Sequence, residues 1–309
     1  MKIVGRIILF LAFVVAIDLA LGLGLKWGHQ QVMTGDTIGR INHALENTNK
    51  EILIFGTSRA IYHIQPEILS NKLGLSTYNA GIHGNGIEAA RLMQDLMVKK
   101  GAHPKIFILQ VDPEFAYKTE LQRTMIFAPF IDESETVKEI LYQVDAFMPI
   151  KLASHTYRYN SLALPIINRL LTGGEPLGDG HFKSITKLDK RVENAQSFET
   201  PDLPMASIIR QCLIDFIELA NSMDAKVIMV TGPIYPPSTK PNSKLRAEFA
   251  SIANEHGAVF FDIHEKNHPV FQNPKLFSDR RHLNMEGSTI LSRLLVQKMV
   301  ELKLASLAE

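Results

Sequence analysis

Short apolar runs alternate with amphipathic stretches along most of the chain, and this alternation predicts the fold. The runs are rich in β-branched and aromatic residues, as buried strands are, and they occupy 51–55, 75–80, 105–111, 225–232 and 258–263. Apolar residues at helical spacing occupy 86–100, 205–223, 241–256 and 285–305. Near-continuous apolar strands separated by helices predict a parallel sheet that is covered on both faces.

The number of strands and the spacing between them predict the architecture and the domain boundaries. Five strands joined by right-handed crossovers predict a three-layer, flavodoxin-like α/β domain over 51–309. One interval, about 115–204, is too long for a simple crossover, and its sequence predicts a mostly helical insertion that ends in a loop. Such an insertion would act as a cap over the site, a substrate surface or a partner-docking lobe, or it would be padding without a role of its own, and the sequence leaves these alternatives open.

The N-terminal segment 1–27 has a different pattern. Lys2 and Arg6 precede nineteen mostly apolar residues, 7–25, which only Asp18 interrupts, and a spanning helix needs about 20. Without a convincing small-residue cleavage site, an uncleaved signal anchor is favoured over a cleaved signal peptide or a buried core helix. Basic residues ahead of the span favour a cytoplasmic N-terminus. The domain is then expected outside the cytoplasmic membrane, in the periplasm or at the cell surface, after an extended tether over 28–50.

Composition and charge exclude some classes of function. The chain has 309 residues, of which 46% are hydrophobic and 21% charged, as in an ordinary globular protein. Its net charge is +1 and it has no block of Lys and Arg, so nucleic acid is not expected as a partner. The single cysteine, Cys212, lies in an apolar helical stretch and is expected to be a buried thiol.

Two short segments carry candidate chemistry. Ser58 follows directly on the first predicted strand, where open α/β sheets bind ligands, and it is either a nucleophile or the cap of the next helix. Asp279 and His282 are three residues apart, just before the last predicted helix. At this spacing a carboxylate can hold the tautomer of an imidazole that takes a proton from a serine.

These segments resemble the SGNH (GDSL-type) hydrolase and acyltransferase superfamily. "IFGTSRA" is similar to the first family block, with Ser58 in the nucleophile position, and "YNAGIHGNG" is similar to the second, with Gly84 in the position of the oxyanion-hole glycine. "TGPIYPP" and "DRRHLNMEG" fit the later blocks, so the resemblance covers about 50–112 and 205–305. It implies a catalytic triad of Ser58, His282 and Asp279, with the backbone of Ser58 and Gly84 forming the oxyanion hole.

The chain departs from the family pattern at two positions. Thr57 replaces the usual Asp before the nucleophile, and Asp112 stands where the family has an oxyanion-stabilising Asn. An ionised carboxylate would repel a developing oxyanion. Asn85, beside Gly84, is a candidate for a substitute donor. Otherwise the hole consists of backbone N–H groups alone, turnover is slow, or the site is specialised.

Other motifs carry less weight. His264 to His268 read H-E-x-x-H, a zinc pattern that requires a helix, but Pro269 restricts His268 to extended backbone. "GIHGNG" follows the second strand without the acidic partner of a dinucleotide site. His63, His83 and His155 are either structural histidines or substrate contacts. No metal and no cofactor are expected.

The resemblance also implies a function. Membrane-anchored members acylate cell-surface polymers, often beside a membrane-bound O-acyltransferase. The chain is therefore expected to be a serine O-acyltransferase of the cell envelope that acetylates, or otherwise acylates, a surface polysaccharide. Its partners would be a glycan or acyl ester substrate, the membrane and such an O-acyltransferase. Two alternatives stay open: an extracytoplasmic carbohydrate or lipid esterase, and a non-catalytic scaffold of a polysaccharide-modifying complex.

Overall fold

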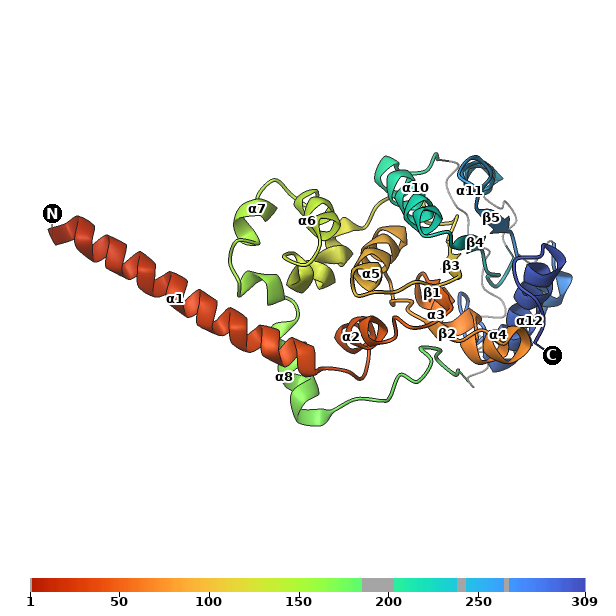
Figure 1. Cartoon of the computed structure of the whole chain (residues 1–309), viewed down its shortest axis with the longest axis horizontal. Helices are drawn as coiled ribbons and strands as arrows, with labels where there is room; N and C mark the ends of the chain where they lie inside the picture. The colour runs from red at the N-terminus through yellow and green to blue at the C-terminus, as the bar shows by residue number, and fades with distance from the viewer. Residues whose placement is uncertain (1, 185–202, 238–242, 264–266, 309) are drawn as a thin grey trace. The chain divides into compact units, whose positions relative to one another are not determined.

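A computed structural model describes residues 2–184, 203–237, 243–263 and 267–308 (Figure 1). The chain forms two compact units. The sheet domain consists of residues 44–120 and 177–309, and the helical lobe consists of residues 1–43 and 121–176. The lobe therefore combines the N-terminal segment with most of the predicted insertion, while 185–202 of that insertion lie outside the described residues.

The sheet domain contains five parallel strands. They are β1 (Ile52–Phe55), β2 (Thr77–Asn79), β3 (Ile106–Gln110), β4 (Lys226–Val230) and β5 (Val259–Phe261). Their order is β2-β1-β3-β4-β5, and every neighbouring pair is parallel. This confirms the flavodoxin-like α/β fold, in which the carboxyl ends of all strands meet at one edge.

Helices cover both faces of the sheet. On one face lie α3 (Ser58–His63), α4 (Pro66–Leu73) and α12 (Met285–Glu301), which share a core with alternate residues of the strands. On the other face lie α5 (Ile87–Lys99), α10 (Ser207–Ser222) and α11 (Ser243–Glu255). Phe216 of α10 packs against Phe55 and Phe107 of the sheet, and Phe249 of α11 stacks on Phe260. The three predicted layers are thus present.

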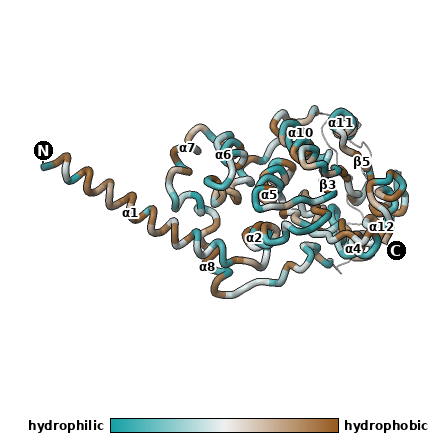
Figure 2. Tube along the Cα trace, in the orientation of Figure 1, coloured by the Kyte–Doolittle hydropathy of each residue, from teal (hydrophilic) through white to brown (hydrophobic). Residues whose placement is uncertain are grey.

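The helical lobe is built on the N-terminal helix α1 (Lys2–Gln31). Its other elements are α2 (Ile38–Glu46, which continues into the sheet domain), η1 (Leu121–Phe130), α6 (Glu135–Tyr142), α7 (Met148–Lys151), η2 (Tyr157–Tyr159) and α8 (Ala163–Thr172). Helix α1 is long and apolar enough to cross a membrane (Figure 2). Its first twenty residues are almost entirely exposed, whereas Gly22, Gly28 and His29 are buried.

The segment predicted as an extended tether, 28–50, differs in the structure. Helix α1 continues to Gln31, and α2 follows it with Ile38 and Ile41 buried. Val32 and Ile38 form a small core with Tyr159 of η2, with Leu162, which caps α8, and with Ile166 of α8. The sequence of α2 is mostly polar, so its few apolar residues did not predict a buried helix. Burial of those apolar residues makes the segment part of the folded lobe.

Candidate active site

The link between β1 and α3 explains why a strand can end on a serine without an intervening loop. Gly56 adopts a φ of +139°, and a Cβ at this position would lie 2.8 Å from the Gln110 carbonyl oxygen. Only glycine fits such a close approach without strain. Thr57 then caps α3, its hydroxyl accepting a hydrogen bond from the Arg59 N–H. Ser58 is the first residue of the helix, at the carboxyl edge of the sheet.

The three residues predicted as a triad lie together. Ser58 Oγ is 2.7 Å from His282 Nε2, and His282 Nδ1 is 2.7 Å from Asp279 Oδ2. With Nδ1–H donating to the carboxylate, Nε2 is left as the acceptor for the serine proton. In this arrangement His282 can act as a base toward Ser58, and Asp279 can orient that base.

Asp279 is held in its ionised form. Burial raises the pKa of its carboxyl, but hydrogen bonds from the His282 ring and from the backbone N–H groups of Arg281 and His282 outweigh this effect and lower the pKa below its ordinary value. The loop ends at Asn284, which caps α12 through the N–H groups of Glu286 and Gly287. The cap fixes where the helix begins and so helps to position the loop that carries His282.

Two residues of α3 contact the loop of His282. The Tyr62 ring lies 4.5 Å from the His282 ring at 35°. His63 is fully buried, and its Nε2 lies 3.0 Å from the carbonyl oxygen of Arg281. Burial, together with the charge of Arg59, lowers the pKa of His63 well below its ordinary value, so the ring is neutral and Nε2–H donates to that carbonyl. His63 therefore ties α3, which carries Ser58, to the backbone of the loop that carries His282.

The predicted oxyanion donors have different surroundings. Ser58 N–H belongs to the first turn of α3, where helical N–H groups have no intrahelical acceptor. Gly84 adopts a left-handed φ of +67° in the turn before α5. Asn85 is buried, its side-chain amide donates to the His83 carbonyl and its N–H donates to the Ile82 carbonyl. Asn85 is thus engaged within its own turn.

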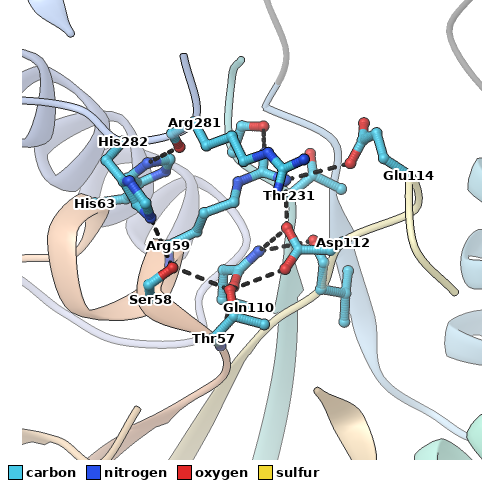
Figure 3. A network of polar contacts seen from close by, with 12 residues as sticks. Thr57, Ser58, Arg59, His63, Gln110, Asp112, Glu114, Thr231, Arg281 and His282 are labelled. Atoms are coloured by element: carbon cyan, nitrogen blue, oxygen red, sulfur yellow. Dashed lines mark hydrogen bonds and ion pairs between the residues drawn. The ribbon is translucent and has the colours of Figure 1, made fainter. Parts of the chain in front are cut away.

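Asp112 belongs to a buried network of polar contacts (Figure 3). Its carboxylate pairs with the Arg59 guanidinium and accepts hydrogen bonds from Gln110 Nε2 at 2.9 Å and Thr57 Oγ1 at 2.9 Å. The Arg59 side chain is only 3% exposed, and it also donates to the Gly232 carbonyl. The carboxylate expected to repel an oxyanion is therefore matched by an adjacent guanidinium.

The network continues across the edge of the sheet. Arg59 is 3.2 Å from Glu114, and Glu114 is 2.8 Å from Arg246. Arg246 in turn pairs with Asp262, which accepts a hydrogen bond from Thr231 at 2.9 Å. These residues follow β1, β3, β4 and β5, apart from Arg246, which belongs to α11. The network thus links the carboxyl ends of four strands next to the turn that carries Ser58.

Sequence reasoning missed this network and the part played by His63. One signal was available: a cation directly after the serine, at Arg59, and two acids, Asp112 and Glu114, after the adjacent central strand. Parallel strand ends meet at one edge, so these opposite charges were placed to pair. Arg246 gave no such signal, because it lies within a helix 132 residues from Glu114.

The other predicted residues lie in various places. His83 and Phe182 contact the Tyr62 ring, at centroid distances of 5.7 and 4.9 Å, so the end of the predicted insertion borders the triad. His155 lies in the helical lobe beside α1. Cys212 is a free, buried cysteine, and burial raises its pKa to about 12.

The zinc-like motif falls mostly outside the described residues, which exclude 264–266. His268 precedes the short 3₁₀ helix η3 (Pro269–Gln272) rather than lying within an α-helix. Within the described part of the chain, no group of three or more His, Cys, Asp or Glu residues could hold a metal ion.

Comparison with known proteins yields similar structures only. No family model and no curated protein matches the sequence. A crystal structure of a proposed acylhydrolase from Bacteroides fragilis NCTC 9343 is similar over 82% of this chain and 87% of that one, with 13% identity and a TM-score of 0.41. An acetyl xylan esterase, Est2A, from the rumen bacterium Butyrivibrio proteoclasticus is similar over 82% of this chain and 64% of that one, with 9% identity and a TM-score of 0.38.

Proposed function

We propose that the chain breaks and forms acyl esters through a covalent acyl-serine at Ser58. The observation that carries this proposal is the continuous pair of 2.7 Å contacts from Ser58 to His282 and from His282 to Asp279. A serine hydroxyl is a weak nucleophile unless an adjacent base takes its proton, and that base works best when a third group orients it. All three groups lie at the edge of the sheet where ligands bind in open α/β folds.

The proposed reaction has two halves. Ser58 Oγ attacks the carbonyl carbon of an acyl ester while its proton passes to His282 Nε2, and the ester C–O bond then breaks as the imidazolium returns that proton to the departing alcohol. In the second half an acceptor O–H attacks the acyl-serine, His282 takes its proton, and Ser58 Oγ leaves with that proton. Asp279 stabilises the imidazolium in both halves.

Backbone N–H groups of Ser58 and Gly84 are the proposed donors to the oxyanion of each tetrahedral intermediate. Asp112 takes no part in this hole. Its three hydrogen-bonding partners and the Arg59 charge support a different task, which is to hold the Thr57–Ser58 turn on the end of β3.

Labelling by a fluorophosphonate tests the acyl-serine. We expect the probe to label the wild type and Ser251→Ala, in which an exposed serine of α11 is changed. It should not label Ser58→Ala, and it should label His282→Ala far more slowly, with thermal unfolding unchanged in each variant. A folded wild type that stays unlabelled would instead support a non-catalytic scaffold.

The identity of the acceptor in the second half of the reaction decides between acyl transfer and hydrolysis. We propose transfer to a hydroxyl of an envelope glycan, supplied with acyl groups at the membrane, because an apolar N-terminal helix would keep the site within reach of a membrane-borne donor. A membrane-bound O-acyltransferase is the corresponding partner. The test is to mix an acyl donor with and without a glycan acceptor and to measure where the acyl group goes. Fast hydrolysis that no glycan changes would leave an esterase.

A further inference from the structure

The N-terminal helix is the base on which the lobe packs. Asp18, Gly22, Leu25, Gly28 and His29 form the face of α1 that is not fully exposed, and the buried Val32 follows directly after the helix. Gly22 and Gly28 permit close contact, since a Cβ at Gly22 would lie 2.4 Å from the His155 Cβ and one at Gly28 would lie 2.9 Å from an Ile166 methyl carbon. Gly24, on the same helix, has nothing within 4 Å of its Cβ position.

The loop 154–156 supplies the polar partners of Asp18. Its carboxylate accepts hydrogen bonds from Ser154 Oγ at 2.6 Å, from the His155 N–H at 2.8 Å and from the Thr156 N–H at 3.0 Å. Thr156 Oγ1 also donates to the backbone carbonyl of Asp18 at 3.2 Å. A charged residue in the middle of an apolar helix is thus bound by protein groups rather than left to water.

The length of α1 places Asp18 at a definite depth if the helix crosses a bilayer. The apolar run before it, residues 7–17, extends only about 16 Å at ~1.5 Å per residue, and the hydrocarbon core is about 30 Å thick. The span must therefore continue past Asp18 to Leu25, where Lys26 and Trp27 provide the ending typical of the interface. Asp18 then lies about 10 Å inside that end, where a carboxylate needs protein partners.

The lobe exposes two groups of apolar side chains. Phe147 and Ile150, at α7, come just before the loop and are 66% and 75% exposed. Helix α8 presents a second row with i, i+3, i+7 spacing, in which Leu164, Ile167 and Leu171 are 78%, 50% and 80% exposed. Exposed apolar groups of this kind mark a membrane or protein interaction site.

We infer that the helical lobe is immersed in the outer boundary of the bilayer, with the loop 154–156 in the hydrocarbon against Asp18 and the apolar side chains of α7 and α8 in contact with lipid. The occupant of this surface is lipid. If α1 crosses the bilayer, Asp18 lies below the interface, and the loop 154–156 that binds Asp18 lies at the same depth. This inference rests on the proposed membrane location of α1 but not on the chemistry of Ser58.

Tryptophan quenching in vesicles tests the depth of the lobe. The chain has one tryptophan, Trp27, so Trp27→Phe gives a silent background for Ile150→Trp, Leu171→Trp and, on the sheet domain, the 51%-exposed control Leu302→Trp. The full-length proteins are reconstituted into phosphatidylcholine–phosphatidylglycerol vesicles with brominated acyl chains. We expect bromolipid to quench both lobe tryptophans at least as strongly as native Trp27, while aqueous acrylamide quenches only the Leu302→Trp protein.

Three results would overturn the inference. Lobe tryptophans reached by acrylamide but not by bromolipid would lie in water. Lobe tryptophans reached by neither would be covered by protein, such as a second copy of the chain. Failure of bromolipid to quench native Trp27 would remove α1 from the bilayer and the lobe with it.

A matched pair of glycine variants then tests whether packing against α1 sets the depth of the lobe in the bilayer. On the Ile150→Trp background, Gly22→Leu should separate the loop from α1 and lose the bromolipid quenching, whereas Gly24→Leu should keep it. Equal quenching in both would show that docking on α1 does not set the depth. Fluorophosphonate labelling of Ser58 in the same vesicles reports on the proposed function alone, so a failure of either proposal is recognised separately.

Discussion

The SGNH superfamily, which the sequence resembles, has Asn at the position of Asp112. The structure nevertheless predicts that Asp112→Asn lowers the stability of this protein and the reactivity of Ser58. Asp112 Oδ1 receives hydrogen bonds from Arg59 and Gln110, while Oδ2 receives that of Thr57. In Asp112→Asn the amide oxygen can still accept the hydrogen bonds from Arg59 and Gln110. The amide nitrogen would face the Thr57 hydroxyl, which can turn its proton to Gln110 Oε1, 3.0 Å away.

The magnitude follows from the change in charge. Asp112→Asn replaces the ion pair with Arg59 by a hydrogen bond from the guanidinium to a neutral amide oxygen, a loss of about 1–2 kcal/mol in the free energy of unfolding. Asp112→Ala removes the acceptor altogether and leaves a buried guanidinium that still has Glu114 as a carboxylate partner. The loss of one member of a buried pair costs about 3–5 kcal/mol, and the remaining partner places this variant near 3 kcal/mol.

The assay is urea unfolding of the full-length protein in mild detergent, combined with the rate of Ser58 labelling. Glu301→Gln is the control, because its pair with Lys298 is exposed on both sides and its loss should cost less than about 0.5 kcal/mol. We expect the order wild type, Asp112→Asn, Asp112→Ala in both stability and labelling. An Asp112→Asn protein that is as stable as wild type and reacts faster would show that position 112 faces the oxyanion, and would refute the network reasoning.

Three further predictions concern the loop of His282 and the lobe. Asp279→Asn should slow Ser58 labelling by up to about 10⁴-fold with only a small fall in the melting temperature, because the folded state favours the ionised carboxylate, and an unchanged rate would exclude a role in orienting His282. Because burial beside Arg59 lowers the pKa of His63, the unfolded chain binds a proton below about pH 6.5 that the folded chain does not, and the free energy of unfolding should fall by up to about 1.4 kcal/mol per pH unit. Melting curves of His63→Gln at several pH values should show a weaker dependence of stability on pH than the wild type. An equal dependence would assign the proton to another group. Deleting residues 1–31 should expose 121–176 to protease, since α1 supplies part of the lobe's core, while the sheet domain stays resistant; an uncut lobe would contradict this.

The sheet and the proximity of Ser58, Asp279 and His282 were predictable because each rests on a local pattern. Strand runs such as 105–111 carry their periodicity within a few residues, and the order of strands follows from crossover rules. The position of Ser58 at a strand end and the spacing of Asp279 and His282 are equally local. The structure brings these three together, as the resemblance to the SGNH superfamily implied.

The remaining features depend on partners far apart in the sequence. Arg59 and Asp112 are separated by 53 residues, and Asp18 lies 136 residues from Ser154. The residues around Asp18 in the sequence do not show whether its carboxylate has a partner. The loop that binds it is far away along the chain. Such pairings become visible only when the chain is folded.

The buried network below the nucleophile has a consequence for how relatives of this chain can differ. Arg59 without an acid at 112 would leave a cation poorly matched, and an acid at 112 without Arg59 would leave an anion under the Ser58 turn. The two positions should therefore change together during evolution: sequences with Asn at 112 should carry an uncharged residue at 59, and those with Arg at 59 should retain Asp or Glu at 112. The pair would then divide the lineage into two groups that no single substitution connects without loss of fitness.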